Sequence, residues 1–288
     1  MNARSTLVWS LRRELWEHRS LYIAPLVAAG FEVLAFTAHI AKQAAPLQGL
    51  SQMDPAKRAF IVAMPYSFSA SMILFITFIV ALFYCLDALY AERRDRSILF
   101  WKSMPVSDRM TVLSKFVVPM AVLPAVAFCV ALATQLLIFA SSGVVLAAKG
   151  VDVGAVWSSL PLGEMTVVMA YGLVVHALWY APIYGALLFV SAWAKKAPFL
   201  WATLPLFGVF LFERIAFDSS YVYSFLKYRV TGAITEGFVP GAGKSMVLST
   251  AQLDPVRFVS SYGLWVGLAL AVAFLAVAIR IRRSREPI

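Results

Sequence analysis

Charged residues are scarce in this sequence. Asp, Glu, Lys and Arg together make up 14% of its 288 residues, whereas 61% of the chain is hydrophobic. A soluble globule of this size needs far more polar side chains to cover its surface. The composition therefore excludes an ordinary soluble domain and predicts an all-α integral membrane protein, with little chain left for a large domain outside the membrane.

Cysteine is also rare, and the two that occur, Cys85 and Cys129, both fall inside apolar runs. This pattern supports neither a disulfide framework nor a cysteine-ligated metal site. The motifs HExxH and GxSxG are missing, and no cluster of His and carboxylates is spaced to build a catalytic metal site. We therefore expect no enzyme activity, no metal and no cofactor in this chain itself.

Residues 241–245 resemble part of a phosphate-binding loop but do not complete its motif. Residues 241–245 read Gly-Ala-Gly-Lys-Ser, but a Walker A motif needs a further glycine five positions before Gly243. Phe238 stands at that position, and Gly237 is one place off. The spacing indicates that any ATP used by this protein is bound by another polypeptide.

Six apolar segments are each long enough to cross a bilayer as a helix. They cover roughly residues 21–41, 67–90, 116–148, 165–193, 198–217 and 259–280. The first contains Glu32 and is longer than the apolar core of a cleavable signal peptide, so we expect it to remain as an anchor. The third and fourth exceed the bilayer thickness, which predicts tilting, extension beyond the membrane, or kinks at Pro119, Pro124 or Pro182.

Two further segments are predicted to lie at the membrane surface. Residues 4–20 form an amphipathic interfacial helix, on which Leu7, Val8, Leu11, Leu15 and Trp16 share one face and basic residues largely occupy the other. Residues 218–258 form the longest connection and carry aromatic and aliphatic residues among glycines. This composition is consistent with segments that dip partly into the membrane and also with ordinary loop packing.

The basic residues predict the orientation of the chain. With the N-terminus inside, sixteen of the 25 Lys and Arg residues fall on the cytoplasmic side in short stretches, and nine fall on the outer side over longer loops. The positive-inside rule then places both termini and residues 92–115 in the cytoplasm, and residues 218–258 outside it. Because these residues lie beside apolar runs instead of forming a stripe, they indicate topology and not nucleic-acid binding.

Residues 92–115 form a charged island between the second and third spans, with the sequence ERRDRSILFWKSMPVSDRMTVLSK. Ser97 is placed to cap a short helix that Pro105 ends. Apolar side chains on a short exposed loop predict a partner that covers them, although a loop folded back on its own helix ends is the alternative. The residues predicted to dock are Ser97, Ile98, Leu99, Phe100, Trp101 and Met104, with Arg93, Arg94 and Arg96 orienting the loop electrostatically.

The stretch ERRDRSILFWKSMPVSD, residues 92–108, resembles the cytoplasmic loop between the second and third spans of ABC-2-type permeases, the transmembrane subunits of bacterial ABC transporters. The order of the six spans extends the resemblance loosely over the whole chain. The resemblance implies that this loop is a coupling helix, which docks on a cytosolic subunit that binds ATP and Mg²⁺. It also implies short re-entrant helices before the last span and an N-terminal helix beside the ATP-binding subunit.

Assembly, location and activity follow from the same resemblance. It implies a second permease copy, identical or related, and a place in the bacterial cytoplasmic membrane. The expected function is ATP-driven transport, as an exporter of an amphipathic, lipid-like or peptide substrate. A membrane anchor or sensor that docks a cytosolic protein without transporting anything is the alternative.

Three ionisable residues inside the spans, Glu32, Asp87 and His176, are candidates for a translocation path or a subunit interface. A charge in hydrocarbon costs about 2.5–3.5 kcal/mol even on the lenient insertion scale, so such residues are rarely without a role. Glu32 lies near the middle of the first span and is the best candidate for a translocation path or a subunit interface. Asp87 lies near the end of the second span, where pairing with an arginine of the loop gives it a structural role. His176 in the fourth span is expected to be a hydrogen-bonded packing residue.

The charge distribution makes a direct topology prediction. Single cysteines introduced at Ser103 and Ser245, after replacement of Cys85 and Cys129, are expected to react with an impermeant maleimide from opposite sides of the membrane. Labelling of both positions from one side would contradict the six-span topology.

Overall fold

The computed structural model describes residues 3–42, 54–103, 106–150, 152–158, 160–239 and 249–284. These residues form helices joined by short connections, with one isolated β-bridge between Phe238 and Leu253. The α-helices are α1 (Ala3–Glu17), α2 (Ser20–Lys42), α4 (Pro55–Asp87), α5 (Tyr90–Arg94), α6 (Ser97–Ser103), α7 (Asp108–Val117), α8 (Leu123–Ala148), α9 (Val153–Trp157), α10 (Leu162–Trp193), α11 (Pro198–Phe217), α12 (Tyr221–Gly237), α13 (Pro255–Ser260) and α14 (Tyr262–Ser284).

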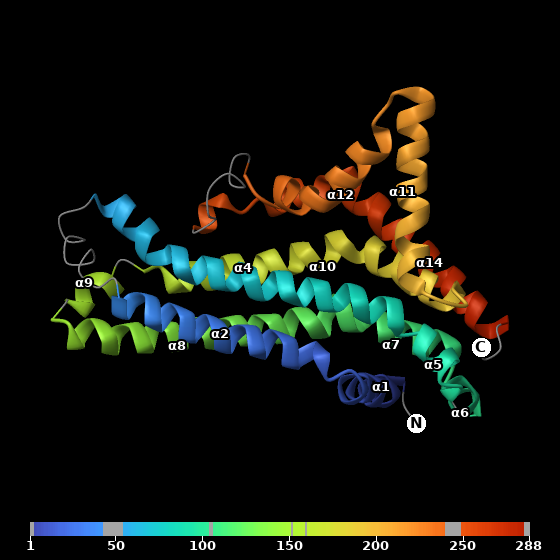
Figure 1. Cartoon of the computed structure of the whole chain (residues 1–288), viewed down its shortest axis with the longest axis horizontal. Helices are drawn as coiled ribbons and strands as arrows, with labels where there is room; N and C mark the ends of the chain where they lie inside the picture. The colour runs from blue at the N-terminus through green and yellow to red at the C-terminus, as the bar shows by residue number, and fades with distance from the viewer. Residues whose placement is uncertain are drawn as a thin grey trace.

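Six helical stretches are long and apolar enough to cross a membrane, which confirms the expected all-α architecture with six candidate spans. They are Ser20–Lys42, Lys57–Arg94, Asp108–Ala148, Leu162–Trp193, Pro198–Phe217 and Tyr262–Ser284. The helix α1 and the end of α14 lie at the same end of the molecule as α5 and α6 (Figure 1). We call this the loop end, and its arrangement agrees with an even number of crossings.

Helices α2, α4, α8 and α10 lie side by side as an elongated bundle (Figure 1). Their shared core is built largely from small side chains, including Ala70 of α4 and Ala127 and Ala131 of α8, around the fully buried Ile73. Small residues allow helices to approach closely where lipid gives no hydrophobic drive for association. The bundle is therefore held by close packing along its middle.

The helix α14 packs along α10 and completes the loop end. Gly185 of α10 lies so close to α14 that a Cβ added there would be 3.2 Å from the backbone of Ala271. Nearer the loop, Leu21, Tyr84, Val112, Leu188 and Leu275 share one buried cluster. These five residues come from α2, α4, α7, α10 and α14, so the loop end joins helices from the whole length of the chain.

The third span is continuous but irregular, as its two prolines predict. Residues Val118–Val122 form one π-helical turn between α7 and α8. Pro119 and Pro124 have no backbone N–H to donate, so the regular hydrogen-bond ladder is interrupted around them. The helix widens locally and then continues as α8 to Ala148.

The apolar face predicted for the N-terminal helix is divided between two environments. Leu11 and Leu15 pack against the core at the loop end, whereas Val8 and Trp16 are exposed. The guanidinium carbon of Arg12 lies 4.7 Å from the ring centroid of Trp16, which joins a cation to the exposed aromatic surface. The helix thus has one face for the protein and a second face suited to a membrane surface.

Residues 218–258, predicted as an outer connection, contain a long helix, α12. The helix α11 projects away from the bundle, and α12 returns beside α10 (Figure 1). The indole N–H of Trp179, near the middle of α10, donates to the carbonyl of Arg229 at 2.8 Å, and the Tyr171 hydroxyl donates to the carbonyl of Gly237 at 2.8 Å. Because these partners lie along α10 itself, α12 packs beside this candidate span, an arrangement consistent with the expected membrane-dipping segment.

The docking of α12 predicts opposite effects for two helical glycines. A Cβ on Gly232 would lie 2.1 Å from the ring of Trp179, whereas a Cβ on Gly208 of α11 would meet nothing within 4 Å. Gly232→Ala is expected to destabilise the fold by about 1–3 kcal/mol through overpacking. Gly208→Ala is expected to be neutral or stabilising, because alanine favours helix over glycine by about 1 kcal/mol. Thermal unfolding in detergent measures both, and equal shifts would contradict the packing of α12 on Trp179.

Candidate functional site

The loop between the second and third spans folds into two short helices joined by a sharp turn. The first, α5, ends at Arg94, and Arg96 has a positive φ of 58° that reverses the chain into α6. The hydroxyl of Ser97 donates to the carbonyl of Glu92 at 3.4 Å and bridges the turn. Ser97 is the first residue of the predicted helix and donates to Glu92, so it is not the helix cap that the sequence predicts. Met104 and Pro105 lie outside the described residues.

The apolar residues of α6 point in two directions. The side chains of Leu99 and Phe100 are 59% and 58% exposed, whereas Ile98 is only 2% exposed and packs inside the chain. Trp101 is half-buried, with the guanidinium carbon of Arg13 only 3.5 Å from its ring centroid. Among the side chains of α6 that the structure describes, the exposed apolar ones are therefore Leu99 and Phe100. The Phe100 ring packs edge-on against Trp101, which in turn contacts α1.

The three arginines before the helix also differ in environment. Arg94 and Arg96 are exposed, but Arg93 is buried and donates to the backbone carbonyls of Ser191 and Ala194 at the end of α10. The Ser191 hydroxyl oxygen accepts hydrogen bonds from the backbone N–H groups of Leu89 and Tyr90 at 3.0 and 2.9 Å. Arg93 thus holds the loop on α10, whereas Arg94 and Arg96 face solvent around the exposed surface.

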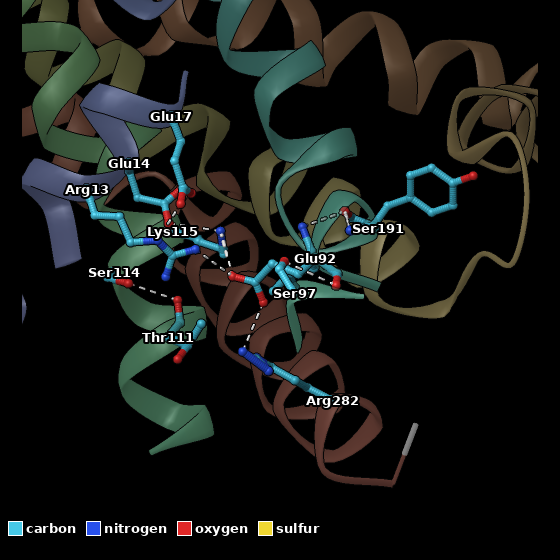
Figure 2. A network of polar contacts seen from close by, with 12 residues as sticks. Arg13, Glu14, Glu17, Glu92, Ser97, Thr111, Ser114, Lys115, Ser191 and Arg282 are labelled. Atoms are coloured by element: carbon cyan, nitrogen blue, oxygen red, sulfur yellow. Dashed lines mark hydrogen bonds and ion pairs between the residues drawn. The ribbon is translucent and has the colours of Figure 1, made fainter. Parts of the chain in front are cut away.

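A network of buried ion pairs lies between the loop and the helices α1, α7 and α14 (Figure 2). The Glu92 carboxylate lies 2.9 Å from the Arg282 guanidinium and 3.2 Å from both the Lys115 ammonium and the Arg13 guanidinium. The Lys115 ammonium also lies 2.9 Å from the Glu14 carboxylate. The network therefore joins α5 to α1, α7 and α14, and we call it the Glu92 network.

Two more groups extend the Glu92 network. The Tyr84 hydroxyl donates to Glu14 at 2.7 Å, and Asp108 lies 3.4 Å from Arg282. Burial by itself raises the pKa of the Glu14 carboxyl, but the Lys115 ammonium and the Tyr84 hydroxyl outweigh it, so this pKa lies below its ordinary value. The stabilisation from ionised Glu14 is therefore present at neutral pH and is lost as the pH falls through that lowered pKa.

The sequence suggests the docking helix but not the network that carries it. Glu14, Lys115 and Arg282 are each at most 4% exposed, and none stands out as a candidate from the sequence pattern. One signal is available in α1, because Glu14 falls on the same helical face as Leu7 and Leu11. A carboxylate on the packed face of an amphipathic helix indicates a buried cationic partner.

The three candidate residues inside the spans are not brought together. Glu32 of α2 accepts a short hydrogen bond from the Ser69 hydroxyl of α4. Asp87 ends α4 and lies 3.5 Å from Arg94, the arginine pairing expected from the sequence. His176 Nε2 lies 3.0 Å from the Tyr184 hydroxyl, and its ring packs edge-on against Phe78. His176 thus makes a hydrogen bond and a ring contact within its own chain, and Glu32 bridges two spans.

Metal and nucleotide chemistry receive no support from the described part of the chain. No group of three or more His, Cys, Asp or Glu side chains is gathered there to hold a metal ion. Cys85 is buried and Cys129 is exposed, on different helices, and both are free thiols. The glycine-rich residues 241–245 lie outside the described residues.

Comparisons with known proteins add no assignment. No protein-family model, no curated protein and no solved structure matches this chain.

The Glu92 network predicts a large cost for removing one of its cations. Lys115→Met removes the ammonium that lies 2.9 Å from Glu14 and one of the three cations around Glu92, and breaking a buried pair in this way costs about 3–5 kcal/mol. The matched control is Arg109→Met, since Arg109 is an exposed cation on the same helix. Unfolding monitored by tryptophan fluorescence should show a large loss for Lys115→Met and little change for Arg109→Met.

A second substitution makes this test specific for charge. Adding Glu14→Gln to Lys115→Met removes one of the stranded carboxylates, so part of the lost stability should return. Additive losses in the double variant would show that the two side chains do not interact.

Proposed function

We propose that this chain is the transmembrane subunit of an ATP-driven ABC exporter, in which α6 is the coupling helix. The observation that carries the proposal is the exposed pair Leu99–Phe100 on α6. This short helix contacts α1 through Trp101 and follows α5, which is itself fixed to α1, α7, α10 and α14. Exposed apolar side chains held rigidly at a loop are suited to a preformed groove on a partner, because little conformational entropy is lost on docking. The sequence resemblance of residues 92–108 supplies the identity of that partner, a cytosolic ATP-binding subunit that carries ATP and Mg²⁺.

The proposed mechanism uses the contacts behind the helix. A displacement of α6 by closing ATP-binding subunits acts on α1 through the contact of Trp101 with Arg13. The same displacement acts on α7 and α14 through Glu92, and on the end of α10 through Arg93. Because α7 continues into the third span and α14 is the sixth, motion of one small surface would tilt several spans together and switch access between the two sides of the membrane.

The exposure of α11 supports the expected assembly with a second permease copy. The helix α11 is almost wholly exposed, and Phe207, Phe212 and Ile215 are each at least 60% exposed. A span with so few contacts in its own chain has a face available for another protein or for lipid.

The proposed cargo is an amphipathic, lipid-like or peptide molecule, since charges within the spans are few.

A membrane anchor or sensor that uses the same surface to hold a cytosolic protein is the second candidate. The exposed pair Leu99–Phe100 fits this function equally well, because docking alone does not require motion of the spans. The two functions differ in whether ATP hydrolysis by the partner is coupled to a movement of this chain.

The docking surface is tested with variants chosen by exposure. The double variant Leu99→Ser/Phe100→Ala is expected to weaken binding of the ATP-binding subunit by about 2 kcal/mol or more, roughly thirtyfold, while the chain keeps its thermal stability. The measurement is co-purification with a candidate ATP-binding subunit that is co-expressed with this chain, together with ATP hydrolysis by the complex. Phe217→Ala is the matched control, because Phe217 is 70% exposed at the far end of α11.

Trp101→Ala is expected to affect stability as well as binding, unlike the Leu99→Ser/Phe100→Ala variant. The Trp101 ring contacts Arg13, so Trp101→Ala should lower both chain stability and partner binding. Retention of the partner by the Leu99→Ser/Phe100→Ala variant would contradict the docking proposal. Retention of the partner with hydrolysis that never changes the accessibility of the spans would favour the anchor.

A further inference from the structure

A cavity of about 570 Å³ lies beside the loop, at the junction of four elements. It is lined by residues from the start of α2, the end of α4, the short helix α5 and the start of α11. Its walls are apolar, with Ile79, Val80 and Phe83 on α4 and Phe199 on α11, and the rings of Phe83 and Phe199 stack with their centroids 6.4 Å apart. These walls belong to two candidate spans, so they face the hydrocarbon of a surrounding bilayer.

One end of the cavity is charged. Asp87 and Arg94 line it where α4 ends, and their side chains, 3.5 Å apart, are 44% and 51% exposed. The Arg94 guanidinium also pairs with Asp95 at 2.9 Å. This cluster therefore holds one cation and two carboxylates at the mouth of an apolar cleft.

Neighbouring His18 does not add positive charge to the cluster. It lines the same cavity, and burial lowers the pKa of its imidazole, so the ring is neutral at neutral pH. A purely anionic headgroup would compete with Asp87 and Asp95 for the single cation, Arg94. A headgroup that carries both a phosphate and an ammonium can instead place the phosphate on Arg94, which keeps its contact with Asp95, and the ammonium on Asp87.

We propose that this cavity binds a zwitterionic phospholipid of the surrounding bilayer, with its phosphate on Arg94, its ammonium on Asp87 and the start of an acyl chain along the wall formed by Ile79, Phe83 and Phe199. An apolar cleft between spans, with a cation and a carboxylate side by side at its mouth, matches the shape and charge order of such a lipid. The site does not depend on the transporter proposal, because a membrane anchor with this fold would carry it as well. Lipid bound there would contact α5 directly, beside the docking helix.

The test compares two lipids on the full-length chain. Delipidated protein in detergent is titrated with phosphatidylethanolamine or with phosphatidylglycerol, and bound lipid is counted by native mass spectrometry. The first lipid is expected to bind more tightly by about fivefold, the discrimination that roughly one exposed ion pair supplies. Equal binding of the two lipids by the unmodified chain would overturn the proposal without any variant.

Two variants then test which side chain binds the phosphate and which binds the ammonium of the lipid. Arg94→Gln is expected to weaken phosphatidylethanolamine binding by about fivefold, whereas Asp87→Asn should remove the preference over phosphatidylglycerol. Both side chains are about half exposed, so folding should survive, and unfolding temperatures verify this. Arg96→Gln is the matched control, since Arg96 is an exposed arginine of the same loop that does not line the cavity. Variants at Arg94 and Asp87 that bind both lipids as the unmodified chain does would also overturn the proposal.

Discussion

The buried carboxylate of Glu92 is the group on which the arrangement of the loop end depends. It is 5% exposed and shares three cations, Arg13, Lys115 and Arg282, which come from the first helix, the third span and the last span. Desolvating so many charges is favourable only when each has a partner at short distance. The ion pairs therefore allow little freedom in how α1, α5, α7 and α14 sit together, and a shift of one element leaves charges unpaired in the others.

The loop end and α11 differ in how firmly they are attached to the rest of the chain. At the loop end, short helices are fixed by ion pairs, by Arg93 on the end of α10 and by the cation–π contact of Arg13 with Trp101. The helix α11, in contrast, projects from the bundle with nearly all of its apolar surface exposed. The fixed loop end and the exposed α11 are therefore the two regions on which the proposed function depends.

The candidate site shows how far a short loop can be understood from its own residues. Apolar residues after a charged run, bounded by Ser97 and Pro105, predicted a short helix, and α6 is that helix. The same pattern does not say which side of the helix is covered by its own chain. Ile98 and Arg93 face inward because Ser191, Ala194 and the core at the loop end lie behind them, and Leu99 and Phe100 remain outside.

Hydrophobic runs are a local property, so the sequence by itself determined the membrane class, the six candidate spans, the loop helix and the irregularity near Pro119. Charge pairing is not local. Glu92 meets Arg13 across 79 positions of sequence and Arg282 across 190, and Lys115 meets Glu14 across 101. Only the packing of α14 on α10 and of α1 on α7 brings these residues together, and the same packing places α12 beside α10. The tertiary structure decided which charges are buried, because a charge leaves water only where the fold supplies its partner.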